Sequence, residues 1–335
     1  MRLLFIGGTG NISAACSRLA LERGHELYLL NRGRRVVQLA GARVLTADIN
    51  DEAATAAVLA GLSFDAVVNF IAFEPGDVER DIRLFSERTA QYVFVSSASA
   101  YQKPPKSPHV TESTPLENPF SPYARGKIAC EERLLAAFGS AGFPVTIVRP
   151  SLTYDTVIPL PLASWQEFTL VERMRRGERV VVHGDGSSLW TITHADDFAV
   201  GLLGLLGKPQ TLGEAFHATS DELLTWDAIY QAVAEAAGAR ANIVHMASDD
   251  IVAAFPEFTR TLLGDKAHSA IFDNSKIRRL VPEFQPTIRF ADGIRRTIAW
   301  FLADATRCVV SSENDAKIQR LLAIHDRQRA DLTRS

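Results

Sequence analysis

The sequence predicts an α/β protein built on a doubly wound parallel sheet, and two observations in its first half support this fold. A short apolar run at residues 3–6 is followed at once by Gly7-Gly8-Thr9-Gly10 and then by a helix-compatible stretch that ends near Gly24. Further apolar runs alternate with helical stretches at a regular interval, as they do when crossover helices join the strands of one parallel sheet. Ligands of such sheets bind beyond the carboxyl ends of the strands.

The glycine-rich turn is the first candidate site. Glycines let the backbone approach a pyrophosphate closely, and the start of the following helix offers free N–H groups to that charge. A plain strand–helix turn could carry the same residues, but the strand before it and the helix after it favour a dinucleotide site. The third glycine of the fingerprint is replaced by Ser13, which predicts slightly looser packing of the helix on the strand.

The remaining strands of the sheet are expected at residues 25–30, 42–47, 64–71, 91–95, 145–148 and 214–219, with helices at 51–60, 77–88 and 196–206. The run at 64–71 is apolar enough to be buried on both faces, as parallel strands are. Polar or small residues stand at or near the ends of these strands, namely Gly7, Asn31, Asp48, Asn69 and Ser97. We therefore expect them along one edge of the sheet.

The end of the second strand bears on the choice of cofactor. It reads Asn31-Arg32-Gly33-Arg34-Arg35, whereas NAD-binding proteins of this type carry a carboxylate there for the ribose 2′-OH. An asparagine does not repel a 2′-phosphate, and arginines can pair with one. NADP is therefore favoured over NAD, although a basic turn can also be no more than a solvated surface.

A proline-rich polar loop without regular structure is expected at residues 103–122, before the next candidate site. It closes at Ser121-Pro122, which suits an N-cap followed by proline at the first helical position. Tyr123 and Lys127 follow four positions apart, so both side chains lie on one face of the predicted helix.

This pair predicts acid–base chemistry. A phenol is a poor acid or base near neutral pH, but a neighbouring ammonium favours the phenolate and lowers the pKa of the phenol. The Ser97 hydroxyl could bond the substrate oxygen while Tyr123 moves its proton and a nicotinamide exchanges a hydride. The alternative is a tyrosine and a lysine that merely share a helix.

Several segments together resemble the extended short-chain dehydrogenases/reductases, of the NAD-dependent epimerase/dehydratase type. The resemblance is carried by residues 7–13, 48–49, 94–101, 121–127 and 149–150 and continues through 183–186 and 193–197. Within the family, residues 216–222 and 224–227 resemble a bacterial subgroup related to chloroplast stem-loop RNA-binding proteins and to isoflavone-reductase-like proteins. The resemblance implies a Rossmann-like fold with a smaller C-terminal lobe that binds the substrate.

The resemblance also implies roles for individual residues. The catalytic set is Ser97, Tyr123 and Lys127. The cofactor-binding set is Gly7, Thr9, Gly10, Asn11, Ile12, Asn31, Arg32, Asp48, Ile49, Phe70, Ile71, Ala72, Lys127 and Pro150. Apart from the resemblance, Phe73, Ser99, Thr153 and Trp190 are candidate substrate-binding residues, and the alternative for Phe73, Thr153 and Trp190 is a role in packing alone. Asp48 and Ile49 would flank the adenine, and Pro150 would lie near the nicotinamide.

One departure from the family concerns the substrate. Nucleotide-sugar epimerases usually carry an arginine that grips the diphosphate just before the segment that corresponds to Thr193-His194, and this chain has Trp190 there. A tryptophan cannot pair with a diphosphate. We therefore expect a sugar-like or polyol substrate with a secondary alcohol or ketone that is not a UDP- or dTDP-sugar.

The chain is expected to divide into a dinucleotide-binding domain at residues 1–154, completed by about 190–220, and a substrate-binding lobe at 155–189 and 221–305. A C-terminal helix is expected within 306–335. The net charge of −3 gives no electrostatic case for nucleic acid, and no apolar run is long enough to span a membrane.

The remaining features predict a cytoplasmic enzyme without a metal. The three cysteines and eight histidines show no metal-ligand spacing. The resemblance implies a possible homodimer through the helix of Tyr123 and its preceding neighbour. Two alternatives to an enzyme stay open: a catalytically silent relative that binds RNA, and a sensor of NADP.

Overall fold

The computed structural model describes residues 1–33 and 39–333. Within these ranges the central sheet has the order β12-β7-β5-β4-β1-β2-β3, and each neighbouring pair of strands is parallel. Its strands are β1 (Arg2–Ile6), β2 (Glu26–Asn31), β3 (Arg43–Thr46), β4 (Ala66–Asn69), β5 (Tyr92–Val95), β7 (Val145–Arg149) and β12 (Ala215–His217). The predicted doubly wound parallel sheet is confirmed.

Helices cover both faces of this sheet. One face packs against α1 (Ser13–Glu22) and α6 (Ala195–Leu205), and the other packs against α2 (Glu52–Val58), α3 (Pro75–Phe85) and α4 (Pro122–Ala141). Side chains of a strand point to alternate faces. Accordingly Leu3 and Phe5 of β1 join the core under α1 and α6, whereas Leu4 and Ile6 join the core under α3 and α4.

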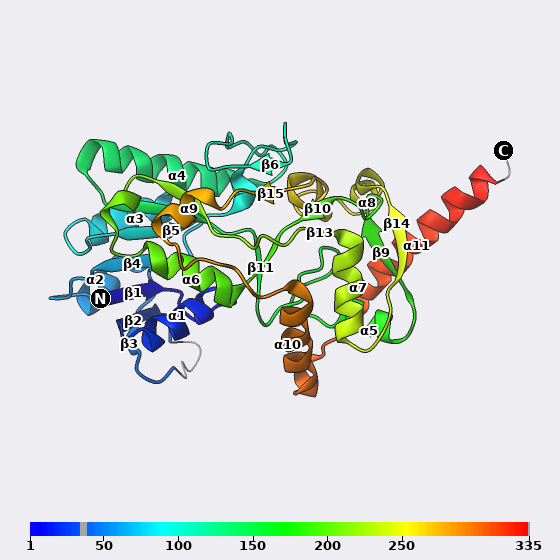
Figure 1. Ribbon diagram of the computed structural model, residues 1–335, viewed down its shortest axis with the longest axis horizontal. Coiled ribbons are helices and arrows are strands. Elements are labelled where there is room, and N and C mark those ends of the chain that lie inside the picture. Colours follow the sequence, from blue (N-terminus) through cyan, green and yellow to red (C-terminus); the bar gives the residue numbers. More distant parts are fainter. Residues whose placement is uncertain (34–38, 334–335) are drawn as a thin grey trace.

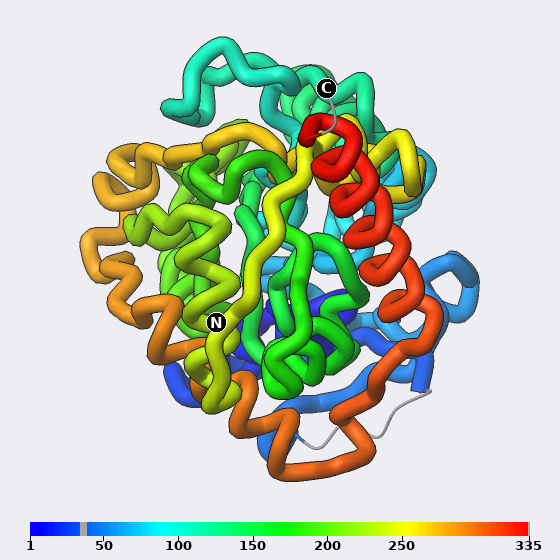
Figure 2. Tube along the Cα trace, turned by 90° about the vertical axis from the view of Figure 1, so that its right-hand side faces the viewer, coloured from blue at the N-terminus to red at the C-terminus, as the bar shows by residue number. Residues whose placement is uncertain are grey.

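The second half of the chain forms a lobe at the other end of the molecule from the N-terminus (Figure 1). It pairs β9 (Arg179–His183) with β14 (Asn242–Met246) and adds α5 (Thr169–Arg175), α7 (Trp226–Ala236), α8 (Ser248–Ala254), α10 (Phe290–Leu302) and α11 (Ser312–Leu332). Its own apolar core includes Trp226, Tyr230 and Phe168. Figure 2 shows the last helix, α11, at the surface of the lobe, where only one stripe of its side chains is buried.

Short elements connect the sheet to the lobe. Three two-stranded pairs are formed, by β6 (His109–Val110) with β15 (Ile271–Phe272), β8 (Leu152–Tyr154) with β11 (Ile192–His194), and β10 (Leu189–Trp190) with β13 (Leu224–Thr225). The short helices are the 3-10 turns η1 (Ala98–Ala100), η2 (Pro209–Thr211), η3 (Pro256–Phe258) and η5 (Ala305–Arg307), the π-helical turn η4 (Leu262–Lys266), and α9 (Ser275–Leu280).

Two segments differ from what the sequence predicted, one in secondary structure and one in packing. The stretch at 103–122, expected to lack regular structure, contributes β6 to a pair with β15. Ile277, Val281 and Phe284 fall within the range expected in the lobe, yet they are fully buried in the core under α6. Both features depend on contacts between segments far apart in the chain. None of the helices in the described ranges is long and apolar enough to cross a membrane.

Candidate active site

The glycine turn lies between β1 and α1, where β1 has β2 on one side and β4 on the other. This is the point at which the strand order reverses, the usual place for a ligand in an open α/β sheet. Gly7 has a φ of +81°, and a Cβ added to it would lie 2.5 Å from Ile71 Cγ2. A Cβ added to Gly8 would lie 2.6 Å from Leu29 Cδ2 and 3.1 Å from Ser17 Oγ. Only glycine combines this backbone conformation with so close an approach.

Ser13 and Asn11 hold the turn in place. The Ser13 hydroxyl donates to the carbonyl of Gly7 at 2.6 Å and accepts from the amide of Gly10 at 2.8 Å. Ser13 therefore closes the turn with side-chain hydrogen bonds at the position of the third glycine. Asn11 donates to the carbonyl of Thr153 at 2.9 Å and accepts from the amide of Asp155 at 3.0 Å, which joins the turn to the start of the lobe.

Two cavities meet at this turn. The smaller has a volume of about 460 Å³ and lies beyond β1 and β2, and the larger has a volume of about 700 Å³ and lies between the sheet and the lobe. Gly7, Gly10 and Ile71 line both of them. The cavities are therefore neighbours that share one wall, the arrangement that a two-part ligand such as a dinucleotide requires.

Most of the residues singled out from the sequence line one of these cavities. Those at the smaller cavity are Gly7, Thr9, Gly10, Asn31, Arg32, Ile49 and Ile71. Those at the larger cavity are Gly7, Gly10, Asn11, Ile12, Phe70, Ile71, Phe73, Ser97, Ser99, Tyr123, Lys127, Pro150, Thr153 and Trp190.

Asp48 and Ala72 line neither cavity. The Asp48 carboxylate accepts from the amide of Asn50 at 3.1 Å, and Ala72 is fully buried. Arg34 and Arg35, which contributed to the expectation of NADP, lie outside the described residues.

Ser97, Tyr123 and Lys127 reach the larger cavity from two elements. Ser97 follows β5 and begins the turn η1, where its hydroxyl lies 2.8 Å from the Ser99 hydroxyl. Ser121 caps α4 by accepting from the amide of Ala124 at 3.2 Å, and Pro122 occupies the first turn, as the sequence predicted. The cap places Tyr123 at the start of the helix and therefore at the cavity.

Lys127 is buried and held by the backbone. Its ammonium donates to the carbonyl of Ala72 at 2.7 Å and to the carbonyl of Val95 at 2.8 Å. It also lies 4.6 Å from the ring centroid of Phe73 and 5.8 Å from that of Tyr123. Burial lowers the pKa of Lys127 to about 8.

The pKa of Tyr123 is raised, not lowered. Burial is the main cause, the Ser97 hydroxyl acts in the opposite direction, and the carboxylate of Asp265 adds to the increase. Arg260 lowers the pKa by a smaller amount. The expectation that Lys127 would make this phenol more acidic is therefore wrong, because the loss of solvent outweighs any neighbouring charge.

The lobe supplies walls that the sequence did not single out. Among them are Trp165, Arg260, Asp265 and Lys266, the last two from the turn η4. Lys266 is buried, pairs with Asp265 at 2.9 Å, and lies between the rings of Trp165 and Trp190 at 5.6 and 5.7 Å. No local pattern marks these residues, because they reach the cavity only through the tertiary fold. Nowhere in the described ranges do His, Cys, Asp or Glu side chains cluster as metal ligands do.

These features define an α/β protein with a dinucleotide-type glycine turn beside a half-buried tyrosine and a buried lysine. A family model described as the NAD dependent epimerase/dehydratase family matches residues 3–218. The chain belongs to this family, which confirms the resemblance drawn from the motifs. It is thus a member of a family of NAD(P)-dependent oxidoreductases and epimerases.

The chain is similar to several curated proteins, and it spans different shares of their length. It is 26% identical to the 2′-dehydrokanamycin reductase of Streptomyces kanamyceticus, over 85% of this chain and 80% of the reductase. It is 27% identical to the chloroplast stem-loop binding protein of 41 kDa b of Arabidopsis thaliana, over 73% of this chain and 65% of that protein. It is 29% identical to a UDP-glucose 4-epimerase of Lactobacillus helveticus, of which it spans about half, 51%.

Solved structures share the fold. Epimerase Mth375 of Methanothermobacter thermautotrophicus superposes with a TM-score of 0.73 at 17% identity, covering 91% of this chain and 93% of that one. A UDP-glucuronic acid 4-epimerase from Bacillus cereus, solved in complex with NAD, gives a TM-score of 0.71 at 17% identity and covers 92% of this chain and all of that one, 100%. At this identity the likeness concerns the fold alone.

The geometry of Gly7 leads to a first prediction. We expect Gly7→Ala to weaken the binding of a nicotinamide dinucleotide by at least about 10-fold, because the new Cβ moves Ile71 into the cavities. Isothermal titration calorimetry measures this affinity.

Gly24→Ala is the matched control. Gly24 has a φ of +72°, and nothing lies within 4 Å of an added Cβ. Both variants should lose about 1–2 kcal/mol of stability through backbone strain, as chemical denaturation would show. Equal dinucleotide affinities in the two variants would contradict the assignment of the turn.

Proposed function

We propose that the protein is an NADP-dependent oxidoreductase that acts on a secondary alcohol or ketone of a sugar-like or polyol molecule. The observation that carries this proposal is the convergence of Ser97, Tyr123 and Lys127 on one cavity that begins at the glycine turn. An acid–base group, a hydroxyl for the reacting oxygen and a dinucleotide cradle then share one space.

The residues present fit such a cofactor. The turn at Gly7–Gly10 suits a pyrophosphate, because three of its four residues are glycines without a Cβ and the start of α1 follows soon after. The smaller cavity would hold the adenosine half, with Ile49 against the base, and the larger would hold the other half near Phe70 and Pro150. A nicotinamide bound there would supply or accept the hydride.

Two neighbouring residues support NADP over NAD. Asn31 ends β2 and Arg32 follows it, and both line the smaller cavity. The buried Nδ2 of Asn31 has no hydrogen-bond partner in the part of the chain that the structure describes, so a donor is available to a ligand oxygen. Arg32 is exposed and offers a guanidinium to a 2′-phosphate.

The chemical step rests on the protonation state of Tyr123. Because its pKa is raised, the phenol is neutral at physiological pH and suited to donate a proton to a carbonyl oxygen. Ser97 would hold that oxygen, and the ammonium of Lys127 would stabilise the phenolate left behind. This favours the reductive direction, and the 2′-dehydrokanamycin reductase, most of which aligns with this chain, is named for a reduction.

RNA binding is the weaker alternative. It rests on likeness to the chloroplast stem-loop binding protein. The net charge of −3 offers no attraction to phosphates, and the acid–base residues are intact. The experiment on Tyr123 below separates the two functions.

The test of the proposal is Tyr123→Phe. Removing the phenolic hydroxyl should lower kcat for reduction of sugar-derived ketones about 10²–10⁴-fold, because the proton donor is lost. The affinity for NADPH should stay unchanged, because the ring remains. Both quantities are measured with a panel of ketones and NADPH absorbance, and by calorimetry.

Tyr28→Phe serves as the control, since its hydroxyl contacts Glu26 and Arg43 at the sheet and not the cavity. Activity in Tyr123→Phe within about threefold of the wild type would reject the acid–base role. RNA affinity that persists in Tyr123→Phe, together with no wild-type activity on any ketone, would instead support the alternative.

Lys127 gives a pH prediction. Its pKa lies below the ordinary lysine value, so the ammonium is lost as the pH rises through about 8. We expect kcat/KM to be level below that pH and to fall above it. In Lys127→Arg, whose guanidinium keeps its charge, the activity that remains should not fall over the same range. A wild-type profile that stays level to about pH 10 would contradict this role of the charge.

The substrate is proposed not to be a nucleotide sugar. Trp190 is buried against Trp226, with ring centroids 5.9 Å apart, and offers no cation to a diphosphate. Lys266 is paired with Asp265, and the Arg260 side chain is exposed to solvent, where an ion pair contributes little to binding. UDP should therefore show no calorimetric binding at micromolar concentration, and micromolar affinity for UDP would overturn this restriction.

A further inference from the structure

The segment at residues 70–73 contributes Ile71 to the wall shared by the two cavities. Ile71 lines both of them, and Phe70 lines the larger one. The carbonyl of Ala72 accepts from Lys127 at 2.7 Å, and the ring of Phe73 lies 6.0 Å from that of Tyr123. A shift of this segment would therefore move the cofactor cradle and the catalytic lysine together.

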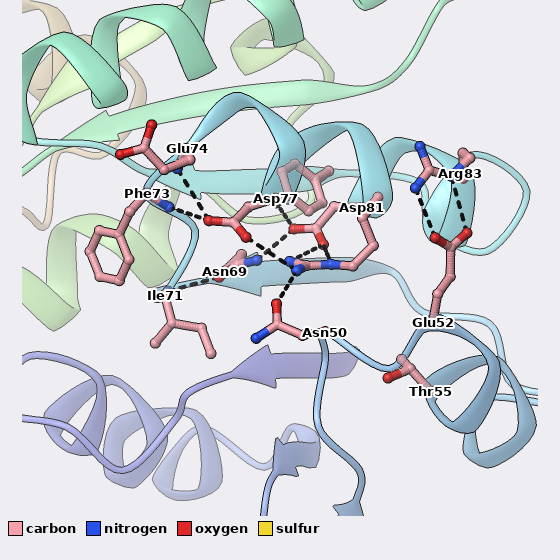
Figure 3. A network of polar contacts seen from close by, with 12 residues as sticks. Asn50, Glu52, Thr55, Asn69, Ile71, Phe73, Glu74, Asp77, Asp81 and Arg83 are labelled. Carbon is pink, nitrogen blue, oxygen red and sulfur yellow. Dashed lines mark hydrogen bonds and ion pairs between the residues drawn. The ribbon is translucent and has the colours of Figure 1, made fainter.

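The segment has no regular structure of its own, because it lies between the end of β4 and the start of α3. Side chains at its two ends hold its amides (Figure 3). Asn69 Oδ1 accepts from the amide of Ile71 at 2.7 Å. Asp77 Oδ2 accepts from the amide of Phe73 at 2.8 Å and from that of Glu74 at 3.1 Å.

The side chains of Asn69 and Asp77 are both linked to Arg80 by hydrogen bonds, Asp77 directly and Asn69 through Asp81. Its Nη1 donates to Asp77 Oδ1 at 3.2 Å, and its Nε and Nη2 donate to Asp81 Oδ1 at 3.0 and 2.9 Å. The other oxygen of Asp81 accepts from Asn69 Nδ2 and from the Tyr92 hydroxyl, each at 2.5 Å. The guanidinium is therefore one contact from Asp77 and two contacts from Asn69.

A further branch of the same network reaches the adenosine side. Arg80 Nη1 donates to Asn50 Oδ1 at 2.7 Å. Asn50 follows Ile49, which lines the smaller cavity. One planar guanidinium with fixed donor directions thus joins three segments that are separate in the chain.

The charges of the network are removed from solvent. The Arg80 side chain is 8% exposed and that of Asp81 is 0% exposed. Burial raises the pKa of Asp81, while Arg80, Tyr92 and Asn69 act in the opposite direction. A buried ion pair is weak evidence for stability, since an apolar contact can be as stabilising. What an apolar contact does not provide is a fixed orientation of the segment at Asn50, the end of β4 and the start of α3 relative to one another.

We propose that Arg80 is a positioning residue that sets the 70–73 segment, and through it Lys127, relative to the adenosine side of the cofactor site. The inference rests on the proposed function, since it assumes that a dinucleotide occupies the two cavities. It assigns Arg80 no contact with substrate or cofactor.

The experiment compares Arg80→Gln with Arg83→Gln. Arg83 lies one turn further on α3 and pairs with the exposed Glu52 at 3.1 and 2.8 Å, away from the 70–73 segment. We expect Arg80→Gln to raise the Kd for NADPH about 10-fold and to move the fall in kcat/KM away from pH 8. Arg80→Lys should not fully restore the Kd for NADPH or the pH dependence of kcat/KM, because an ammonium lacks the planar set of donors of a guanidinium. Arg83→Gln should change neither quantity.

Asn50→Ala tests one branch alone and keeps the test possible if Arg80→Gln does not fold. Asn50 is exposed, so its removal should raise the Kd for NADPH a few fold and leave kcat unchanged. Arg80→Gln with a lower thermal midpoint but an unchanged Kd and pH profile would overturn the inference, as would an unchanged Kd in Asn50→Ala. A wild-type chain that binds neither NADPH nor NADH would instead overturn the proposed function, and the positioning of a dinucleotide with it.

Discussion

The site depends on how the ammonium of Lys127 is held. A buried charge is costly unless hydrogen bonds replace its water, and two carbonyls do so here, one from Ala72 and one from Val95. These carbonyls belong to the segments after β4 and at the end of β5. The lysine therefore fixes α4 against the carboxyl edge of the sheet, next to the glycine turn. The ring centroids of Phe73 and Phe94 lie 4.6 and 4.7 Å from Nζ of Lys127, so these two rings also pack against the ammonium.

One helical turn further along α4, a second buried contact anchors the same helix. Glu131 forms a bidentate ion pair with Arg149 of β7. It also accepts a hydrogen bond from the Ser96 hydroxyl at 2.5 Å. Ser96 precedes Ser97, and Arg149 precedes Pro150. Breaking such a pair leaves an uncompensated buried charge, so the register between α4 and the two strand ends is strongly constrained. The positions of Ser97, Tyr123 and Lys127 follow from these contacts.

The sequence predicted the parts of the site that local chemistry encodes. The glycine turn, the Ser121 cap and the spacing of Tyr123 and Lys127 each depend on a few neighbouring residues. The pKa of Tyr123 could not be predicted, because burial is a property of the whole fold and is the largest cause of the raised pKa. The lobe wall at Arg260–Lys266 was missed for the same reason: it lies more than a hundred residues after Tyr123 in the chain.

A contact joins that wall of the lobe to the serine turn beside Tyr123. The buried amide of Asn118 donates to the carbonyl of Ser99 at 2.8 Å and to the carbonyl of Gly264 at 2.7 Å. It therefore ties the serine turn beside Tyr123 to the π-helical turn that carries Asp265 and Lys266. One fold can carry many functions, which depend on the groups placed around its site. In the proposed function the sheet edge would hold the proton donor, and the turn of the lobe tied to it by Asn118 would help to determine which substrate reaches that donor.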